Sequence, residues 1–339
     1  MNNLQALGKF LDQPVLVAKF HKSVPAILAG TTALYTAFHT LKAPEGEKKK
    51  TAVNTGITLG IASASAVAAP RIAASIIRKK EPVSLTKIKD KSKKLINQFL
   101  ETNKTDKATK KILEKCKNKV LDIKEIKTLY KNLSNDKNGK KLLEKLVPPP
   151  KNESAEDIFD DIGYLSILGA VPVAGGIMGG IAADKITDKN NFKEKISDKI
   201  KEGSYQYLAN IFMCNIGAGA ALAILEQAEI KSKAARAIGM TAGIIATGII
   251  GGSKIANKIG EKVIDPVCDK LFGKNQNKQK FNDVLTIQRK ERTPELLDIG
   301  LHTDDIATVS VLSGLKWIEP ALPLMYTISG YRAGIGYRN

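Results

Sequence analysis

The residues of this sequence that are best spaced for chemistry are Lys316 and Glu319, in the stretch LKWIEPALP. Three residues apart, they would share one face of a helix and lie within reach of each other. They fall inside the apolar run 306–330, and Pro320 and Pro323 follow them directly. An ionisable pair beside a helix break in a membrane span typically marks a substrate or ion site. Lys316 and Glu319 are therefore a candidate intramembrane pair.

A second interpretation of this stretch comes from Trp317, which lies between the two ionisable residues. Tryptophan is enriched where a membrane helix reaches the water interface, and long charged side chains extend to the same level. In that case the apolar span is shorter, and Lys316 and Glu319 only anchor its end. The sequence leaves both interpretations open.

Paired glycines form the other constellation, first in AGGIMGGIAAD, residues 174–184, and again near residue 250. They repeat the spacing GxxxG, as Gly175–Gly179, Gly176–Gly180, Gly239–Gly243 and Gly248–Gly252. A glycine inside a helix in water costs roughly 1 kcal/mol relative to alanine. In a membrane, glycines four residues apart leave a groove into which a second helix packs. We therefore expect these glycines to lie at helix–helix contacts of the glycine-zipper type.

Other stretches give weaker evidence for a binding or catalytic site. The segment SNDKNGKKLLEK resembles a calcium loop, but Ser134 and Lys145 occupy positions where that loop needs acidic ligands. We expect a turn between two helices there. His302 lies near Asp304 and Asp305, an arrangement that is usually just solvated in a charged loop. The sequence contains no nucleophile elbow, phosphate-binding loop or dinucleotide fingerprint, so we expect no enzymatic activity.

Cysteine and histidine usage gives no sign of a metal site. Cys116, Cys214 and Cys268 are odd in number and far apart, so we expect reduced structural thiols and no disulfide framework. The three histidines show no paired spacing of the HExxH kind. We expect neither a metal nor a cofactor.

Long apolar runs dominate the rest of the chain. Six of them occur, at 24–41, 51–69, 162–183, 205–225, 237–252 and 306–330. A bilayer core of about 30 Å needs about 20 helical residues, which 162–183 and 205–225 meet best. Helices that are apolar all round belong in lipid or at the centre of a large protein, and this chain has too little amphipathic helix to cover six. The sequence predicts an all-α membrane protein with Gly/Ala-rich packed helices and a lysine-rich helical polar domain.

The alternation of apolar and charged stretches sets the expected boundaries. The first segment could dock on the rest of the protein or lie on a membrane surface. The expected parts are an amphipathic N-terminal helix (1–23), a helical hairpin (24–77), a basic amphipathic helical domain with its linker (78–161), three apolar helices with a charged amphipathic connector (162–252), a charged polar region (253–305) and a C-terminal apolar segment with a Gly-Tyr-Arg tail (306–339).

The charge balance points to a diffuse anionic partner. The formal net charge is +19, and aromatic residues make up only 5% of the chain. Most of the cations are lysines, which act as point charges, whereas arginine reads bases and phosphates through a fork. This favours an anionic lipid surface over nucleic acid. Lysines occur in nearly every connection, so no alternation of charged loops fixes a topology.

Together these patterns favour a non-enzymatic integral protein of the cell membrane, with a structural or membrane-organising role. It would pack, and could form a homo-oligomer, through its glycine-rich helix faces. One alternative is a small-solute transporter or channel that uses Lys316 and Glu319. Another is a soluble helical protein that binds polyanions.

Overall fold

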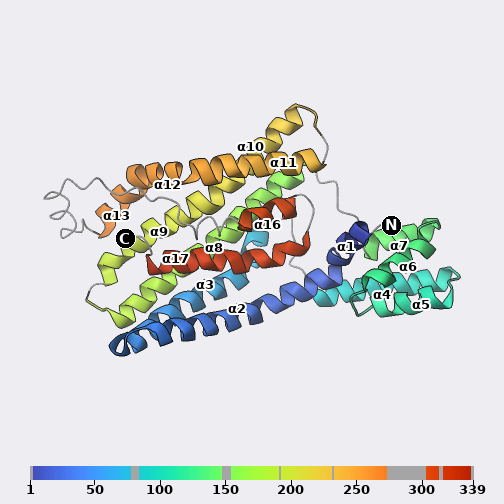
Figure 1. The fold of residues 1–339 in the computed structure, drawn as a ribbon, viewed down its shortest axis with the longest axis horizontal. Helices are drawn as coiled ribbons and strands as arrows, with labels where there is room; N and C mark the ends of the chain where they lie inside the picture. The colour runs from blue at the N-terminus through green and yellow to red at the C-terminus, as the bar shows by residue number, and fades with distance from the viewer. Residues whose placement is uncertain are drawn as a thin grey trace. The chain divides into compact units, whose positions relative to one another are not determined.

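The computed structural model describes residues 3–77, 84–146, 154–190, 192–230, 233–272, 303–312 and 316–336. Within these ranges all regular structure is helical, and no strand occurs (Figure 1). The all-α prediction is therefore confirmed for the described residues. The chain divides into two compact units.

The first, here called the lysine-rich unit, comprises residues 1–23, 81–153 and 314–320. The second, here called the apolar unit, comprises residues 24–80, 154–313 and 321–339. The helix α2, Pro14–Lys42, begins in the lysine-rich unit and continues into the apolar unit.

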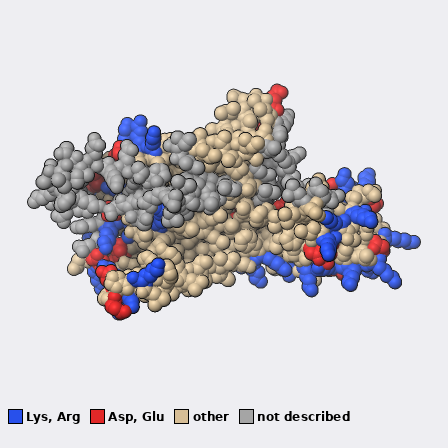
Figure 2. Space-filling model, in the orientation of Figure 1, with Lys and Arg blue, Asp and Glu red and all other residues tan. Residues whose placement is uncertain are grey.

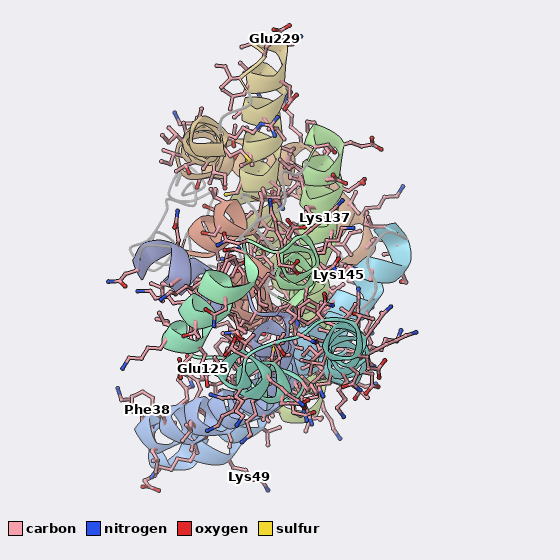
Figure 3. The ribbon with its side chains drawn as sticks, turned by 90° about the vertical axis from the view of Figure 1, so that its right-hand side faces the viewer. Phe38, Lys49, Glu125, Lys137, Lys145 and Glu229 are labelled. Carbon is pink, nitrogen blue, oxygen red and sulfur yellow. The ribbon has the colours of Figure 1, made fainter. Side chains whose placement is uncertain are left out.

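The lysine-rich unit is a bundle of short amphipathic helices, α1 (Asn3–Leu11), α4 (Leu85–Thr102), α5 (Lys107–Cys116), α6 (Ile123–Leu133) and α7 (Lys137–Leu146). Its core consists of the apolar positions that recur at helical spacing, among them Ile96, Phe99, Leu113, Cys116, Leu121, Ile126, Leu129, Leu133, Leu142, Leu143 and Leu146. Each of these helices thus turns an apolar face to the core of the unit. Lysines cover its surface, including Lys137 and Lys145 of α7 (Figures 2 and 3).

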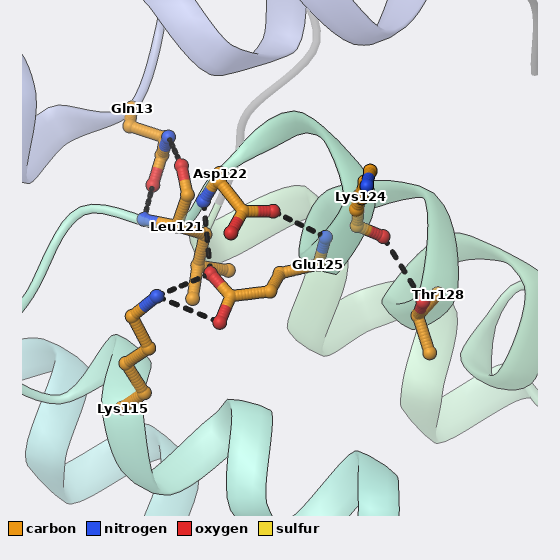
Figure 4. Close-up of polar contacts among 7 residues, drawn as sticks. All are labelled: Gln13, Lys115, Leu121, Asp122, Lys124, Glu125 and Thr128. Carbon is orange, nitrogen blue, oxygen red and sulfur yellow. Dashed lines mark hydrogen bonds and ion pairs between the residues drawn. The ribbon is translucent and has the colours of Figure 1, made fainter.

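Polar contacts join the N-terminal segment to the start of α6 (Figure 4). The Gln13 amide donates to the Leu121 carbonyl at 2.8 Å and accepts from the Leu121 N–H at 2.8 Å. Asp122 and Glu125 form a capping box, and both Glu125 carboxylate oxygens accept from Lys115. Such caps satisfy backbone N–H groups that a helix start would leave unpaired. These contacts fix the N-terminal segment within the lysine-rich unit.

The expected single helix over residues 1–23 is two helices. The first, α1, ends at Leu11, and α2 begins at Pro14, because proline fits the first turn of a helix but not its interior. The Lys9 ammonium lies 5.0 Å from the Tyr130 ring centroid, and Phe10 packs on the core of the unit. The sequence left open whether this segment docks on the protein or lies on a membrane surface. In the structure, α1 docks on α6.

The calcium-loop segment forms the turn that we expected between α6 and α7. α6 ends at Leu133 and α7 begins at Lys137. The Asp136 carboxylate accepts from the Gly139 N–H at 2.6 Å, so its oxygen caps a helix.

The apolar unit contains the remaining described helices, including the two longest, α3 and α8. These helices are α3 (Lys48–Ile77), α8 (Ala155–Thr187), α9 (Phe192–Tyr207), α10 (Met213–Gln227), α11 (Lys233–Ile244), α12 (Ser253–Ile259), α13 (Asp265–Phe272), α16 (Thr303–Leu312) and α17 (Leu322–Ile335). A short turn, η1 (Glu45–Glu47), joins α2 to α3. Three π-helical stretches continue these helices, η2 (Leu208–Phe212), η3 (Ile245–Gly252) and η4 (Gly260–Ile264). α8 packs against α3, α9, α10 and α17 (Figure 1).

Three helices among the described residues are long and apolar enough to cross a membrane. They cover Glu45–Ile77, Glu156–Thr187 and Lys195–Gln227, and contain the predicted runs 51–69, 162–183 and 205–225. A fourth segment, Ala235–Gly248 with Ser253–Phe272, reaches the same length and hydropathy only as a pair bent by 46°. Neither 24–41 nor 306–330 lies in a helix that qualifies within the described ranges.

The charged connector predicted before residue 205 is mostly helix. α8 continues to Thr187, and α9 starts at Phe192 and runs through η2 into α10. Only a short turn separates α8 from α9. Within this segment the charged residues Asp184, Lys199 and Glu202 are buried.

The C-terminal apolar run is interrupted. α16 ends at Leu312, a 3₁₀ turn, η5, covers Lys316–Ala321, and α17 begins at Leu322 with Pro323 in its first turn. The first Gly-Tyr-Arg of the expected tail is buried inside α17, where Tyr331 packs edge-on against Tyr35 with ring centroids 5.4 Å apart.

Candidate functional site

Two overlapping GxxxG pairs of α8 face two different helices. A Cβ on Gly175 would overlap the Ser65 side chain of α3, and one on Gly179 would lie 3.0 Å from the Thr58 Cα. A Cβ on Gly176 or Gly180 would overlap a backbone carbonyl of α17, at Gly330 or Gly334 respectively. Here the backbones of α8 and α17 approach so closely that no side chain fits between them.

The later glycines also lie where another element approaches. A Cβ on Gly243 would overlap the Gly217 carbonyl of α10, and one on Gly248 would overlap the Cys214 Sγ. On Gly239 it would lie 2.6 Å from the Leu225 Cδ1, and on Gly252 it would lie 2.8 Å from the Ala209 carbonyl oxygen. The structure therefore places each predicted glycine against a neighbour in the same chain.

A stripe of buried polar residues follows one face of α9 and continues into η2, and sequence reasoning did not single it out. It consists of Lys199, Glu202, Gln206 and Asn210. Gln206 donates to Glu202 at 2.7 Å, and Asn210 donates to Gln206 at 2.8 Å. Glu202 and Gln206 are both 0% exposed. Positions three and four residues apart share a helix face, so the signal was present in the sequence as the spacing of these residues.

The π-helix η2 carries this stripe into α10. The Met213 N–H bonds to the Leu208 carbonyl, five residues back. A π turn contains about one residue more than an α-helical turn, because its hydrogen bonds join residues five apart. Asn215, five residues after Asn210, therefore lies one π turn further along the same face. Asn215 is buried and donates to Ser166 of α8 at 2.9 Å. Single π turns inside α-helices recur at functional sites.

The charged end of the stripe is an ion pair between α9 and α8. Lys199 Nζ lies 2.8 Å from Asp184 Oδ2, and the two side chains are only 4% and 7% exposed. Both residues belong to helices that could cross a membrane. Arg332 of α17 is also buried, at 3% exposed. Buried charges of this kind cost several kcal/mol each unless they are paired.

The predicted pair Lys316 and Glu319 is not on an α-helix. Both residues lie in the 3₁₀ turn η5, ahead of α17. Glu319 is partly buried, whereas the side chain of Lys316 lies outside the described residues. His302 and the side chains of Asp304 and Asp305 also lie outside them.

Cys116, Cys214 and Cys268 are buried free thiols. In the lysine-rich unit, burial raises the pKa of the Cys116 thiol to about 11, with a smaller contribution from Glu125. This environment suits a structural thiol, because the reactive form is the thiolate. Among the described residues, no three His, Cys, Asp or Glu side chains are grouped to hold a metal ion.

We expect Lys199→Met to lower the stability of the protein by about 3–5 kcal/mol, because Asp184 would stay buried without its cation. The double variant with Asp184→Leu should recover much of that loss. Lys185→Met, one residue from Asp184 but exposed, serves as the control. Thermal unfolding of the full chain in detergent measures the effect. Equal melting temperatures for Lys199→Met and Lys185→Met would rule out the buried pair.

Comparison with protein-family models, with curated proteins and with solved structures found no match to this chain.

Proposed function

We propose that this chain is an integral protein of the cell membrane with a structural, membrane-organising role and no enzymatic activity. The observation that carries the proposal is the set of three long apolar helices. Helices of this length and hydropathy match the hydrocarbon core of a bilayer.

The glycine contacts support the same proposal. Between helices in lipid there is little hydrophobic driving force, so association depends on close van der Waals packing over small residues. α8 approaches α3 and α17 through four glycines. Since these glycines already face helices of the same chain, a homo-oligomer would use other surfaces.

We further propose that the lysine-rich unit contacts anionic lipid headgroups. Its helices bury their apolar faces in their own core and expose lysines (Figure 2). A basic residue near an anionic membrane surface contributes about 1 kcal/mol, screened by salt.

Membrane integration is tested by alkaline carbonate extraction of membranes from cells that express the full chain. The protein should stay in the pellet, because apolar helices that cross the bilayer are not released when electrostatic contacts are lost. The control is a peripheral protein that lysines alone hold to the membrane surface, and it should be released. Release into the supernatant would refute integration and favour the soluble polyanion-binding alternative.

The glycine contacts are tested by comparing Gly176→Ala with Gly30→Ala. A methyl group on Gly176 would overlap the Gly330 carbonyl, whereas nothing lies within 4 Å of a Cβ on Gly30. We expect Gly176→Ala to destabilise the protein by about 1–3 kcal/mol through overpacking. Gly30→Ala should be neutral or stabilise it by up to about 1 kcal/mol. Melting temperature and elution profile in detergent give the answer, and two variants that both behave like the parent would contradict the packing.

Small-solute transport is a second candidate, favoured by the buried polar stripe inside the helix Lys195–Gln227. Ionisable residues at such positions commonly line ion pathways. Vesicles that contain the protein should then pass rubidium ions or protons faster than empty vesicles, and Glu202→Gln should abolish the difference. The exposed Glu261→Gln is the control. If vesicles with the parent protein pass neither rubidium ions nor protons faster than empty vesicles, transport of both ions is excluded.

A further inference from the structure

The α2–α3 hairpin contains an open groove of about 910 Å³. This volume lies within the range of roughly 300–1,000 Å³ typical of sites for small ligands. Small and apolar side chains from both helices line the groove, among them Leu28, Ala33, Ala37, Gly56, Gly60 and Val67. The groove therefore has room for a ligand, but its lining provides few hydrogen-bonding groups for a polar one.

Three of the four hydroxyl groups along the groove have partners in the protein, whereas the buried Thr36 Oγ1 has none among the described residues. Thr32 and Ser63 hydrogen-bond to each other at 2.8 Å, and Thr40 donates to the Thr36 carbonyl at 2.7 Å. Along α2 the lining runs from Pro25 to Leu41, which is about 24 Å at roughly 1.5 Å per residue. A lipid chain in one leaflet spans about half of a hydrocarbon core about 30 Å thick, so this length accommodates an acyl chain.

Positive charge lies at one end of the groove, where Leu41 and Ala52 flank the turn between the helices. Residues 42–50 contain four lysines and two glutamates. Glu45 pairs with Lys48, which leaves Lys42, Lys49 and Lys50 exposed. Figure 3 shows Lys49 pointing outward from the hairpin. An apolar channel that ends at exposed lysines complements an anionic amphiphile.

We propose that this groove binds an anionic glycerophospholipid, with an acyl chain along α2 and α3 and the phosphate at Lys42, Lys49 and Lys50. The inference rests on the proposed membrane location and adds a lipid class and a site to it. Lysine suits this partner because it provides point charges for a phosphate without demanding a fixed geometry.

The test uses the full chain in phosphatidylcholine vesicles that contain a minority of phosphatidylglycerol. One or the other lipid carries a photoactivatable diazirine in its acyl chain, and mass spectrometry locates the cross-linked peptides. We expect phosphatidylglycerol to label the groove-lining segments of α2 and α3 in preference to phosphatidylcholine.

Gly60→Leu blocks the groove, and Gly30→Leu is its matched control. Both glycines have open space around a built Cβ, but only Gly60 lines the groove. Gly60→Leu should reduce labelling of the groove by about tenfold, as expected when a filled apolar site excludes its ligand. Gly30→Leu should label like the parent.

The headgroup contact is tested separately by changing Lys42, Lys49 and Lys50 to Gln. This variant should keep groove labelling but lose the preference for the anionic lipid by about tenfold. The control changes three exposed lysines of α4, Lys91, Lys93 and Lys94, to Gln and should keep the preference.

Equal labelling of the parent and Gly60→Leu, or no preference between the two lipids, would overturn the proposal. Cross-links between two copies through α2 or α3 would also overturn it and assign the groove to a second copy of the chain. A protein that resists carbonate extraction but shows any of these results would refute only the lipid site. Release by carbonate would instead refute the membrane location on which the site rests.

Discussion

The close approach of α8 to two other helices is the constraint on which the apolar unit depends. Consecutive residues of a helix point about 100° apart, so adjacent glycines serve different faces. Gly175 and Gly179 admit α3, while Gly176 and Gly180 admit α17. Backbone meets backbone at Gly176 and Gly330, which leaves no volume for even one methyl group. The glycines that weaken α8 as an isolated helix therefore determine where its neighbours lie.

That close packing also decides how the buried charges are held. α9 packs against both α8 and α17, so the polar face of α9 is removed from solvent. In a medium of low dielectric constant an unpaired charge is costly and a matched one interacts strongly. Lys199 therefore meets Asp184, and the amides of Gln206 and Asn210 extend the network from Glu202. The residues that could carry an ion are thus also the residues that join the helices.

The sequence predicted what depends on local spacing. The core of the lysine-rich unit follows from apolar positions such as Leu113, Ile126 and Leu129, because a helical period brings them to one face. What it missed depends on tertiary contacts. The segment before residue 205 was predicted to be a charged amphipathic connector, but its sequence could not show that Lys199 is buried by a partner on another helix. Likewise, glycine spacing indicated packing faces at Gly176 and Gly180 but could not identify α17 as the neighbour, nor that Lys316 and Glu319 would lie in a 3₁₀ turn.

The hairpin of α2 and α3 exposes apolar side chains on α2, although α2 does not qualify as a membrane span. α3 meets α8 at Thr58 and Ser65 and meets α2 at Ser63, which hydrogen-bonds to Thr32 at 2.8 Å. On α2, Leu34, Phe38 and Leu41 lie on one helix face and are 74%, 54% and 75% exposed. A soluble protein rarely exposes such a row, whereas a surface against lipid requires it. If acyl chains cover this row, the lysines that follow at the turn reach the level of the headgroups. The hydrophobic effect would then orient the hairpin, although α2 by itself is not apolar enough to cross the bilayer.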